Sequence, residues 1–259
     1  MDWGFVAEDF EFMIDLEPKG CFTVFDDTRF IGLTTTISYG RLGWIGNVIV
    51  EQDYRNRGAG SILIEKSIDF LKKKGAESIG LYSYTDTTTF YESLGFKNDK
   101  AFMYLTGSVF GESPTEKLQP MSTEQFVNAV TFDERCVGAS REKLLKAIYT
   151  KAGNLCYSIY EGKEITGFIM TKISPKTLEV GPITGKAGTE NTMSNLLNEV
   201  LGNFRGFEIY LGIPENKLKM ISTLNTLRVH SKFKVVRMYY GEILQDKGCG
   251  LAMESLERG

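Results

Sequence analysis

A strand-like apolar run leads directly into a basic, glycine-rich turn that opens a helix, and this junction constrains the chain more than any other feature. The run ends at residues 48–50 (VIV), the turn at residues 55–60 reads RNRGAG, and apolar residues then recur at helical spacing. Gly58 and Gly60 permit positive φ and close approach of a ligand to the backbone. Because the free N–H groups and the dipole of a helix start favour anions, the junction predicts a pyrophosphate cradle.

Two common phosphate-binding motifs do not match this turn. A P-loop requires lysine followed by serine or threonine after its second glycine, whereas Ser61 and Ile62 follow Gly60. A dinucleotide-binding fingerprint requires a third glycine where Leu63 stands. An ordinary strand-to-helix turn with solvated arginines is the alternative that needs no ligand.

The turn resembles motif A of the Gcn5-related (GNAT) acetyltransferases, in which a basic residue and two spacers precede Gly-x-Gly. Residues 91–96, YESLGF, resemble the FYExLGF helix end of the same family. The resemblance covers residues 20–106 with the elements in the family's order. It implies acetyl-CoA as cosubstrate and direct transfer of acetyl to an amine of a small molecule or a peptide.

The resemblance also implies roles for individual residues. The backbone of Val48, Ile49 and Val50 holds the pantetheine like an added strand, and one of its N–H groups polarises the thioester carbonyl. Tyr91 protonates the departing thiolate, since a phenol with a pKa of about 10 can donate to a thiolate of similar basicity. A packing aromatic is the alternative for Tyr91. The residues implied to hold the pyrophosphate are Arg55, Asn56, Arg57, Gly58, Ala59, Gly60 and Ser61.

The general base is not evident from the sequence. Some family members carry a glutamate on the strand before motif A, but residues 43–50 (GWIGNVIV) contain no acid. Glu51 ends that strand and Asp86 opens the following short helix, and each fits a surface or capping position better than a base. A water chain is an equal alternative. His230, the only histidine, stands among basic residues and is expected in solvent.

Residues 107–118, rich in glycine, serine, proline and charge, predict a linker. It separates an N-terminal GNAT domain (1–106) from a C-terminal GNAT-like domain (119–259). Both halves show hairpin, strand, helix, strand, helix and strand in that order. The expected fold class is therefore α+β with a mixed sheet, as two GNAT-like modules in tandem.

The second half resembles the C-terminal domain of a subgroup of tandem acetyltransferases. The matching pieces lie at residues 132–141, 180–182 and 233–241, and in the tail at 253–259. Its turn at 183–188, ITGKAG, lacks the Arg-x-x-Gly-x-Gly spacing. We therefore expect a degenerate second module and one CoA site per chain.

Periodicity and turn residues predict the individual elements. Helices are expected at 7–16, 60–74, 86–94, 122–131, 141–149, 190–201 and 217–227. Strands are expected at 21–25, 30–38, 43–50, 78–84, 101–105, 156–160, 164–173, 178–180, 207–211 and 235–241. Family members usually have a further strand and helix before the first helix, so either the module is trimmed or Met1 lies downstream of the natural start.

Composition excludes several classes of protein. A formal net charge of −3 gives no reason to expect nucleic acid or an anionic membrane as partner. The four cysteines are far apart and form no CxxC pair, so neither zinc nor a disulfide framework is expected. The N-terminus lacks a basic region and no apolar run reaches about 18 residues, so a cytoplasmic protein is expected.

Three functional hypotheses remain open from the sequence. The first is an active N-acetyltransferase, and the second is an acyl-CoA-binding or regulatory module without catalysis. In the third, the second half is only an interaction domain. The acceptor cannot be read, because the aromatic residues that could line an amine pocket serve equally well as core: Trp44, Tyr82, Tyr84, Phe90 and Tyr91.

Overall fold

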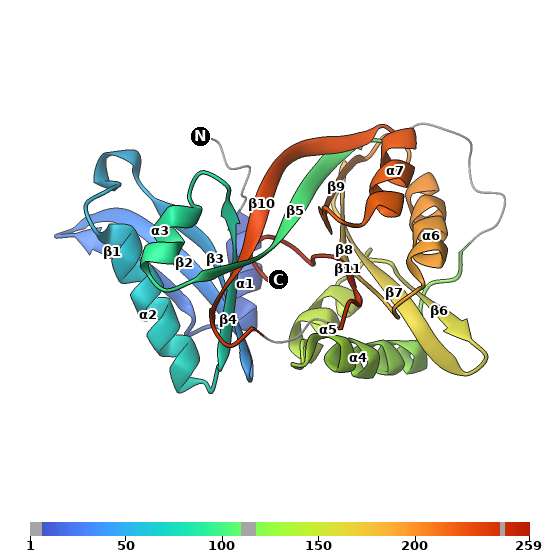
Figure 1. The fold of residues 1–259 in the computed structure, drawn as a ribbon, viewed down its shortest axis with the longest axis horizontal. Helices are drawn as coiled ribbons and strands as arrows, with labels where there is room; N and C mark the ends of the chain where they lie inside the picture. The colour runs from blue at the N-terminus through green and yellow to red at the C-terminus, as the bar shows by residue number, and fades with distance from the viewer. Residues whose placement is uncertain (1–6, 110–117, 244–246) are drawn as a thin grey trace. The chain divides into compact units, whose positions relative to one another are not determined.

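The computed structural model describes residues 7–109, 118–243 and 247–259, which form two compact units (Figure 1). Unit 1 consists of Met1–Asp99, Arg237–Ile243 and Leu256–Gly259, and unit 2 of Lys100–Val236 and Leu244–Ser255. Each unit combines helices with a mixed sheet, so the predicted fold class, α+β with a mixed sheet, is confirmed. Both units draw on segments that lie far apart in the sequence.

The sheet of unit 1 has the order β1-β2-β3-β4-β10. Strands β1 to β3 are antiparallel neighbours, whereas β3 and β4 run parallel. Only the last part of β10 belongs to this unit. The strands are β1 (Cys21–Asp26), β2 (Arg29–Tyr39), β3 (Leu42–Val50), β4 (Ser78–Tyr84) and β10 (Val229–Gly241).

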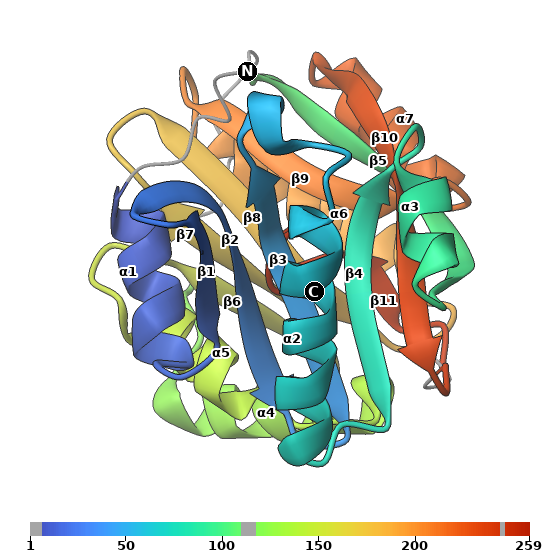
Figure 2. The ribbon, with the colours of Figure 1, turned by 90° about the vertical axis from the view of Figure 1, so that its left-hand side faces the viewer.

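Helix α2 (Ala59–Lys73) packs on one face of this sheet, in front of the strands in Figure 2. Every residue of its predicted apolar stripe is buried, namely Leu63, Ile64, Ser67, Ile68 and Leu71. The Leu71 side chain packs where a β-carbon of Gly43 would lie, so this position of β3 faces α2. Two other helices complete the unit, α1 (Ala7–Leu16) and α3 (Thr88–Ser93).

A bulge interrupts β3 next to β2. Leu33 pairs with Ile49 and Thr35 with Gly46, so two steps on β2 oppose three on β3. Asn47 lies at this bulge with a φ of 50°. The bulge re-aims the end of the strand just before the glycine-rich turn.

Unit 2 repeats this plan. Its sheet has the order β10-β5-β9-β8-β7-β6, with β11 paired to β8. The bulge also recurs, because Ile169 pairs with Ile183 and Thr171 with Val180. The strands are β5 (Lys97–Ser108), β6 (Cys156–Glu161), β7 (Glu164–Ile173), β8 (Thr177–Gly185), β9 (Glu208–Pro214) and β11 (Gly250–Ala252). The helices are α4 (Thr123–Val137), α5 (Glu142–Thr150), α6 (Glu190–Gly202) and α7 (Leu218–Thr226).

Most predicted elements are confirmed within two residues at each end, and the helix at 7–16 and the strands at 78–84 and 164–173 match fully. Larger differences affect β5, β8, β9, β10 and α4, all longer than predicted, and β11, which was not predicted. Of the predicted linker, residues 110–117 lie outside the described residues, and 107 and 108 belong to β5. The domain boundaries at 106 and 119 stay a prediction.

Candidate active site

Strands β3 and β4 of unit 1 pair only at their beginnings. The parallel ladder joins Leu42 to Ser78, Gly43 to Ile79 and Trp44 to Gly80, and no further pair follows. Residues 47–50 are half-buried. At the bulge, the Asn47 amide nitrogen donates to Thr35 Oγ1 at 3.1 Å, while its buried Oδ1 has no partner among the described residues. The predicted pantetheine-binding residues Val48, Ile49 and Val50 thus lie on a split between two strands.

The basic turn presents free backbone donors at the start of α2. Gly58 is the residue before the helix, with a φ of 90°, and Asn56 has a φ of 60°. The first bond of the helix runs from Ile62 N to the Gly58 carbonyl oxygen, 3.1 Å away. No side chain caps this end. The N–H groups of the first helical turn are therefore available to an anion.

Both arginines of the turn are exposed. The Arg55 Nε donates to the Val50 carbonyl oxygen at 3.1 Å, which ties the turn to the end of β3. The Arg57 guanidinium lies 5.7 Å from the centre of the Tyr54 ring. Neither is ion-paired within the described part of the chain, so their charges can act on a bound anion.

Tyr91 is brought to the same region by α3. A β-carbon on Gly60 would lie 3.2 Å from the Phe90 ring, so α3 packs closely against the turn. Tyr91 is only 9% exposed, between the rings of Phe90 and Phe96. Burial raises the pKa of Tyr91 to about 12. The phenol therefore keeps its proton at any working pH, which is the form that an acid requires.

The aromatic residues considered for an acceptor pocket differ in their surroundings. Trp44 and Tyr91 are buried, whereas Tyr82, Tyr84 and Phe90 are half-buried. The centroids of the Trp44 and Tyr82 rings are 5.1 Å apart. Trp44 is therefore core, and the half-buried rings are the ones that could contact a ligand.

The acids and the histidine considered from the sequence lie on the surface. Glu51 forms an exposed ion pair with Arg29, at 2.8 Å between Oε2 and NH2. Asp86 is exposed. His230 is exposed in unit 2, with its Nδ1 3.1 Å from Asn225 Oδ1. The expected surface positions are thus confirmed for these residues.

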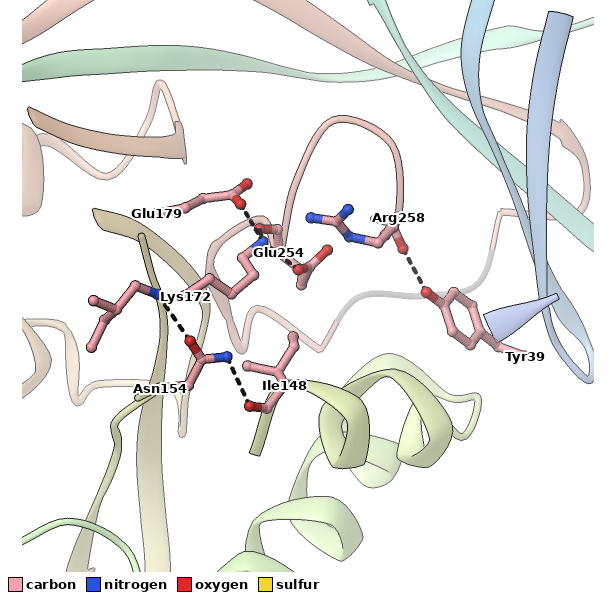
Figure 3. Close-up of polar contacts among 8 residues, drawn as sticks. Tyr39, Ile148, Asn154, Lys172, Glu179, Glu254 and Arg258 are labelled. Atoms are coloured by element: carbon pink, nitrogen blue, oxygen red, sulfur yellow. Dashed lines mark hydrogen bonds and ion pairs between the residues drawn. The ribbon is translucent and has the colours of Figure 1, made fainter. Parts of the chain in front are cut away.

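The sequence did not predict the contacts of the tail segment, defined here as residues 249–259. In unit 1, Tyr39 donates its hydroxyl to the Arg258 carbonyl at 2.8 Å, and the Trp44 ring nitrogen lies 3.4 Å from the Leu256 carbonyl oxygen. In unit 2, Lys172 Nζ contacts Glu254 at 2.5 Å and Glu179 at 2.6 Å (Figure 3). Only the family-like ending at 253–259 pointed to this segment.

The matching split in unit 2 is filled by the chain itself. Strands β8 and β9 pair in parallel only from Thr177–Glu208 to Glu179–Tyr210. Beyond this point, β11 pairs with β8. Gly185 N donates to the Cys249 carbonyl at 2.9 Å on one side, and Met253 N donates to the Gly212 carbonyl at 2.9 Å on the other. Residues 249–253 thus bridge the two strands that diverge.

The four cysteines are free thiols, three of them buried and Cys21 half-buried. Within the described ranges, no group of three histidine, cysteine, aspartate or glutamate side chains could hold a metal ion. Each helix in those ranges is too short or too polar to span a bilayer.

The sequence matches known protein families and individual relatives. Residues 2–96 match the family described as "Acetyltransferase (GNAT) family", and residues 129–249 match "Acetyltransferase (GNAT) domain". The chain is 22% identical to holothin acyltransferase of a Pseudoalteromonas species over 267 residues, covering 99% of the chain and 87% of that protein. It is 29% identical to N-alpha-acetyltransferase 30 of Schizosaccharomyces pombe over 113 residues, covering 38% of the chain and 73% of that protein.

A solved structure has the same fold over the full chain. It is a proposed acetyltransferase from Pyrococcus horikoshii, with a TM-score of 0.78 at 16% identity, covering 100% of this chain and 88% of that one. The two family matches define the class, that of the acyltransferases. The chain belongs to the GNAT acetyltransferase family and carries two GNAT domains in tandem.

Proposed function

We propose that unit 1 transfers an acetyl group from acetyl-CoA to an amine. The observation that carries this proposal is the split between β3 and β4 beside the free donors at the start of α2. The split leaves the outer edge of residues 48–50 available to an added strand-like ligand. The turn offers backbone N–H groups and two arginines to a pyrophosphate.

The residues present fit such a cosubstrate. Nothing lies within 4 Å of a β-carbon built on Gly58, so there is space above the turn for a phosphate. The unpartnered Oδ1 of Asn47 can accept from an amide N–H of a pantetheine arm. Acetyl-CoA would supply the thioester, and the chain would bind and orient it through residues 48–50 and 55–61.

The chain's own groups then stabilise the reacting atoms. An N–H at the end of β3 would donate to the thioester carbonyl oxygen, which gains charge during attack. Tyr91 would donate a hydrogen bond to the departing sulfur. Because its pKa of about 12 lies above that of a thiol, Tyr91 acts by donating a hydrogen bond as the C–S bond breaks.

We propose one cofactor site per chain, with unit 2 as a degenerate module. Residues 249–253 occupy its strand split, and residues 183–188 lack the basic glycine-rich spacing. The relative from fission yeast is named as an N-alpha-acetyltransferase, so amines of peptides and small molecules are the acceptors to test first. The free thiols support a cytoplasmic location.

The test is incubation of the full chain with acetyl-CoA and a panel of small amines and peptide N-termini, with release of free thiol as the readout. We expect amine-dependent thiol release and acetylated product by mass spectrometry. Binding of acetyl-CoA without turnover on any amine would favour a non-catalytic acyl-CoA-binding module. Failure to bind acetyl-CoA would overturn the proposal.

A further inference from the structure

The tail segment lies against one face of the sheet in unit 1, at the level where the strands split. A β-carbon on Gly46 would collide with the backbone of Glu257. A β-carbon on Gly259, in turn, would lie 2.8 Å from the Trp44 ring. Gly46 directly precedes the bulge at Asn47. The glycine thus allows the backbone of Glu257 to approach β3 where the proposed thioester site begins.

The alternation of side chains along β3 shows which face of the sheet the tail segment contacts. Gly43 faces α2, so Trp44 and Gly46 face the opposite side of the sheet. Tyr82 of β4 lies on the same side, because its ring packs against Trp44. Arg258 follows Glu257 there, with its guanidinium 5.1 Å from the Phe12 ring of α1. Glu257 therefore lies on the face of the sheet away from α2.

The carboxylate of Glu257 also acts on the other strand. The pKa of Tyr84, at the end of β4, is raised by burial and by the negative charges of Glu257 and Asp86. The backbone of Glu257 thus lies beside Gly46 of β3, and its negative charge acts on Tyr84 of β4. Of the other two acids considered near this site, Glu51 is paired with Arg29 and Asp86 is exposed.

We propose that Glu257 is the general base of the acetyl transfer, which deepens the proposed function and rests on it. As the amine lone pair forms the C–N bond with the acetyl carbonyl carbon, the nitrogen loses one proton to the Glu257 carboxylate. The C–S bond breaks with its electron pair on sulfur, and Tyr91 donates a hydrogen bond to the thiolate. Glu257 then passes its proton through solvent to this thiolate, so the products are an N-acetyl amine and CoA thiol.

The experiment compares Glu257→Gln with the wild type in the full chain. A general base contributes about 10²–10⁴-fold, so we expect kcat to fall at least about 100-fold, while acetyl-CoA affinity and thermal stability stay unchanged. Glu257→Asp should retain more activity than Glu257→Gln. Asp86→Asn is the matched control, because it removes the other charge acting on Tyr84, and it should keep wild-type turnover.

A pH–rate profile separates a base from a substrate-binding group. The wild type should lose activity at acid pH as Glu257 takes up a proton, and this loss should be absent from the residual rate of Glu257→Gln. Other ionisable groups around this face are Tyr39, Tyr82, Tyr84, Asp86, Arg237 with its partner Asp99, and Arg258. These groups are all present in Glu257→Gln. The difference between the pH–rate profiles of the wild type and this variant therefore reports the protonation of Glu257.

The outcomes are distinguishable. A wild type that turns over amines while Glu257→Gln keeps its kcat overturns the base and leaves the proposed function standing. A rise in the acceptor KM of Glu257→Gln at unchanged kcat also overturns the proposed base, because that result assigns Glu257 to binding alone. A wild type without turnover overturns both. NMR titration of ring-labelled tyrosine provides a readout without activity, since Glu257→Gln should lower the pKa of Tyr84.

Discussion

At the scale of single residues, the site depends on environment more than on residue type. Arg55 and Arg57 are exposed, whereas Tyr91 is almost fully buried and its pKa rises to about 12. The sequence predicted the phosphate-binding turn from residue type and spacing. It could not predict that Glu257 lies beside Gly46, because the family-like ending at 253–259 does not indicate which strand it contacts until the chain is folded.

Arg55→Ala tests the turn. Loss of a charged hydrogen bond to a phosphate should weaken acetyl-CoA binding by about 1–3 kcal/mol, measured by isothermal titration calorimetry. Arg41→Ala is the control, since Arg41 is exposed at the opposite end of β3 and paired with Glu77. Equal affinity of both variants and the wild type would identify Arg55 as a solvated surface charge.

Tyr91→Phe tests the acid. We expect turnover to fall at least tenfold, equivalent to about 1.4 kcal/mol of barrier, while acetyl-CoA binding survives. Because burial raises the pKa of Tyr91, its contribution should persist as pH rises and disappear only as pH passes about 12. Tyr210→Phe is the control, since Tyr210 lies in unit 2 and its pKa is also about 12. Unchanged turnover of Tyr91→Phe would remove Tyr91 from the mechanism.

At the scale of elements, two local features build the site. The bulge in β3 and the end of its pairing with β4 open the split, and the left-handed Gly58 starts α2 without a side-chain cap. Glycine, asparagine and apolar periodicity predicted the strand, turn and helix. The bulge and split were not predictable from β3 alone, because both depend on which strands lie beside it.

Gly58→Ala tests the helix start. With a φ of 90°, alanine there should cost about 1–2 kcal/mol of stability and add a methyl group to the space above the turn. Gly75→Ala is the matched control at the other end of α2, where φ is 92° and nothing lies within 4 Å of the β-carbon. Chemical denaturation should show similar losses of stability in the two variants. Only Gly58→Ala should also weaken acetyl-CoA binding. Equal affinity in the two variants would contradict a ligand at this helix start.

At the scale of the whole molecule, the two units are not consecutive pieces of chain. Arg237–Ile243 and Leu256–Gly259 belong to unit 1. Within unit 1, Tyr239 packs against Trp44 with ring centroids 6.2 Å apart, and Lys72 donates to the Tyr240 hydroxyl at 3.0 Å. The repeated order of elements predicted two modules, whereas this return of the chain was not visible from local patterns.

A fragment of residues 1–106 tests this return. It lacks the end of β10 and the tail segment. Strand β4 therefore loses its neighbour β10, and the face of the sheet that carries Trp44 loses the tail segment that contacts it. We expect the fragment to aggregate or to unfold without a cooperative transition, whereas the full chain unfolds cooperatively, as followed by circular dichroism and calorimetry. A fragment as stable as unit 1 in the full chain would show that these segments contribute little.

Most elements of both modules and the turn at residues 55–60 could be predicted from the sequence, because periodicity, glycine positions and spacing are local properties. The folded chain was needed to show how long β8 and β10 run, that residues 249–253 fill the split of unit 2, and that Glu257 lies beside Gly46. These features depend on contacts between residues distant in sequence. A local pattern carries no information about such contacts, and pairing, burial and charge proximity arise only when the chain folds.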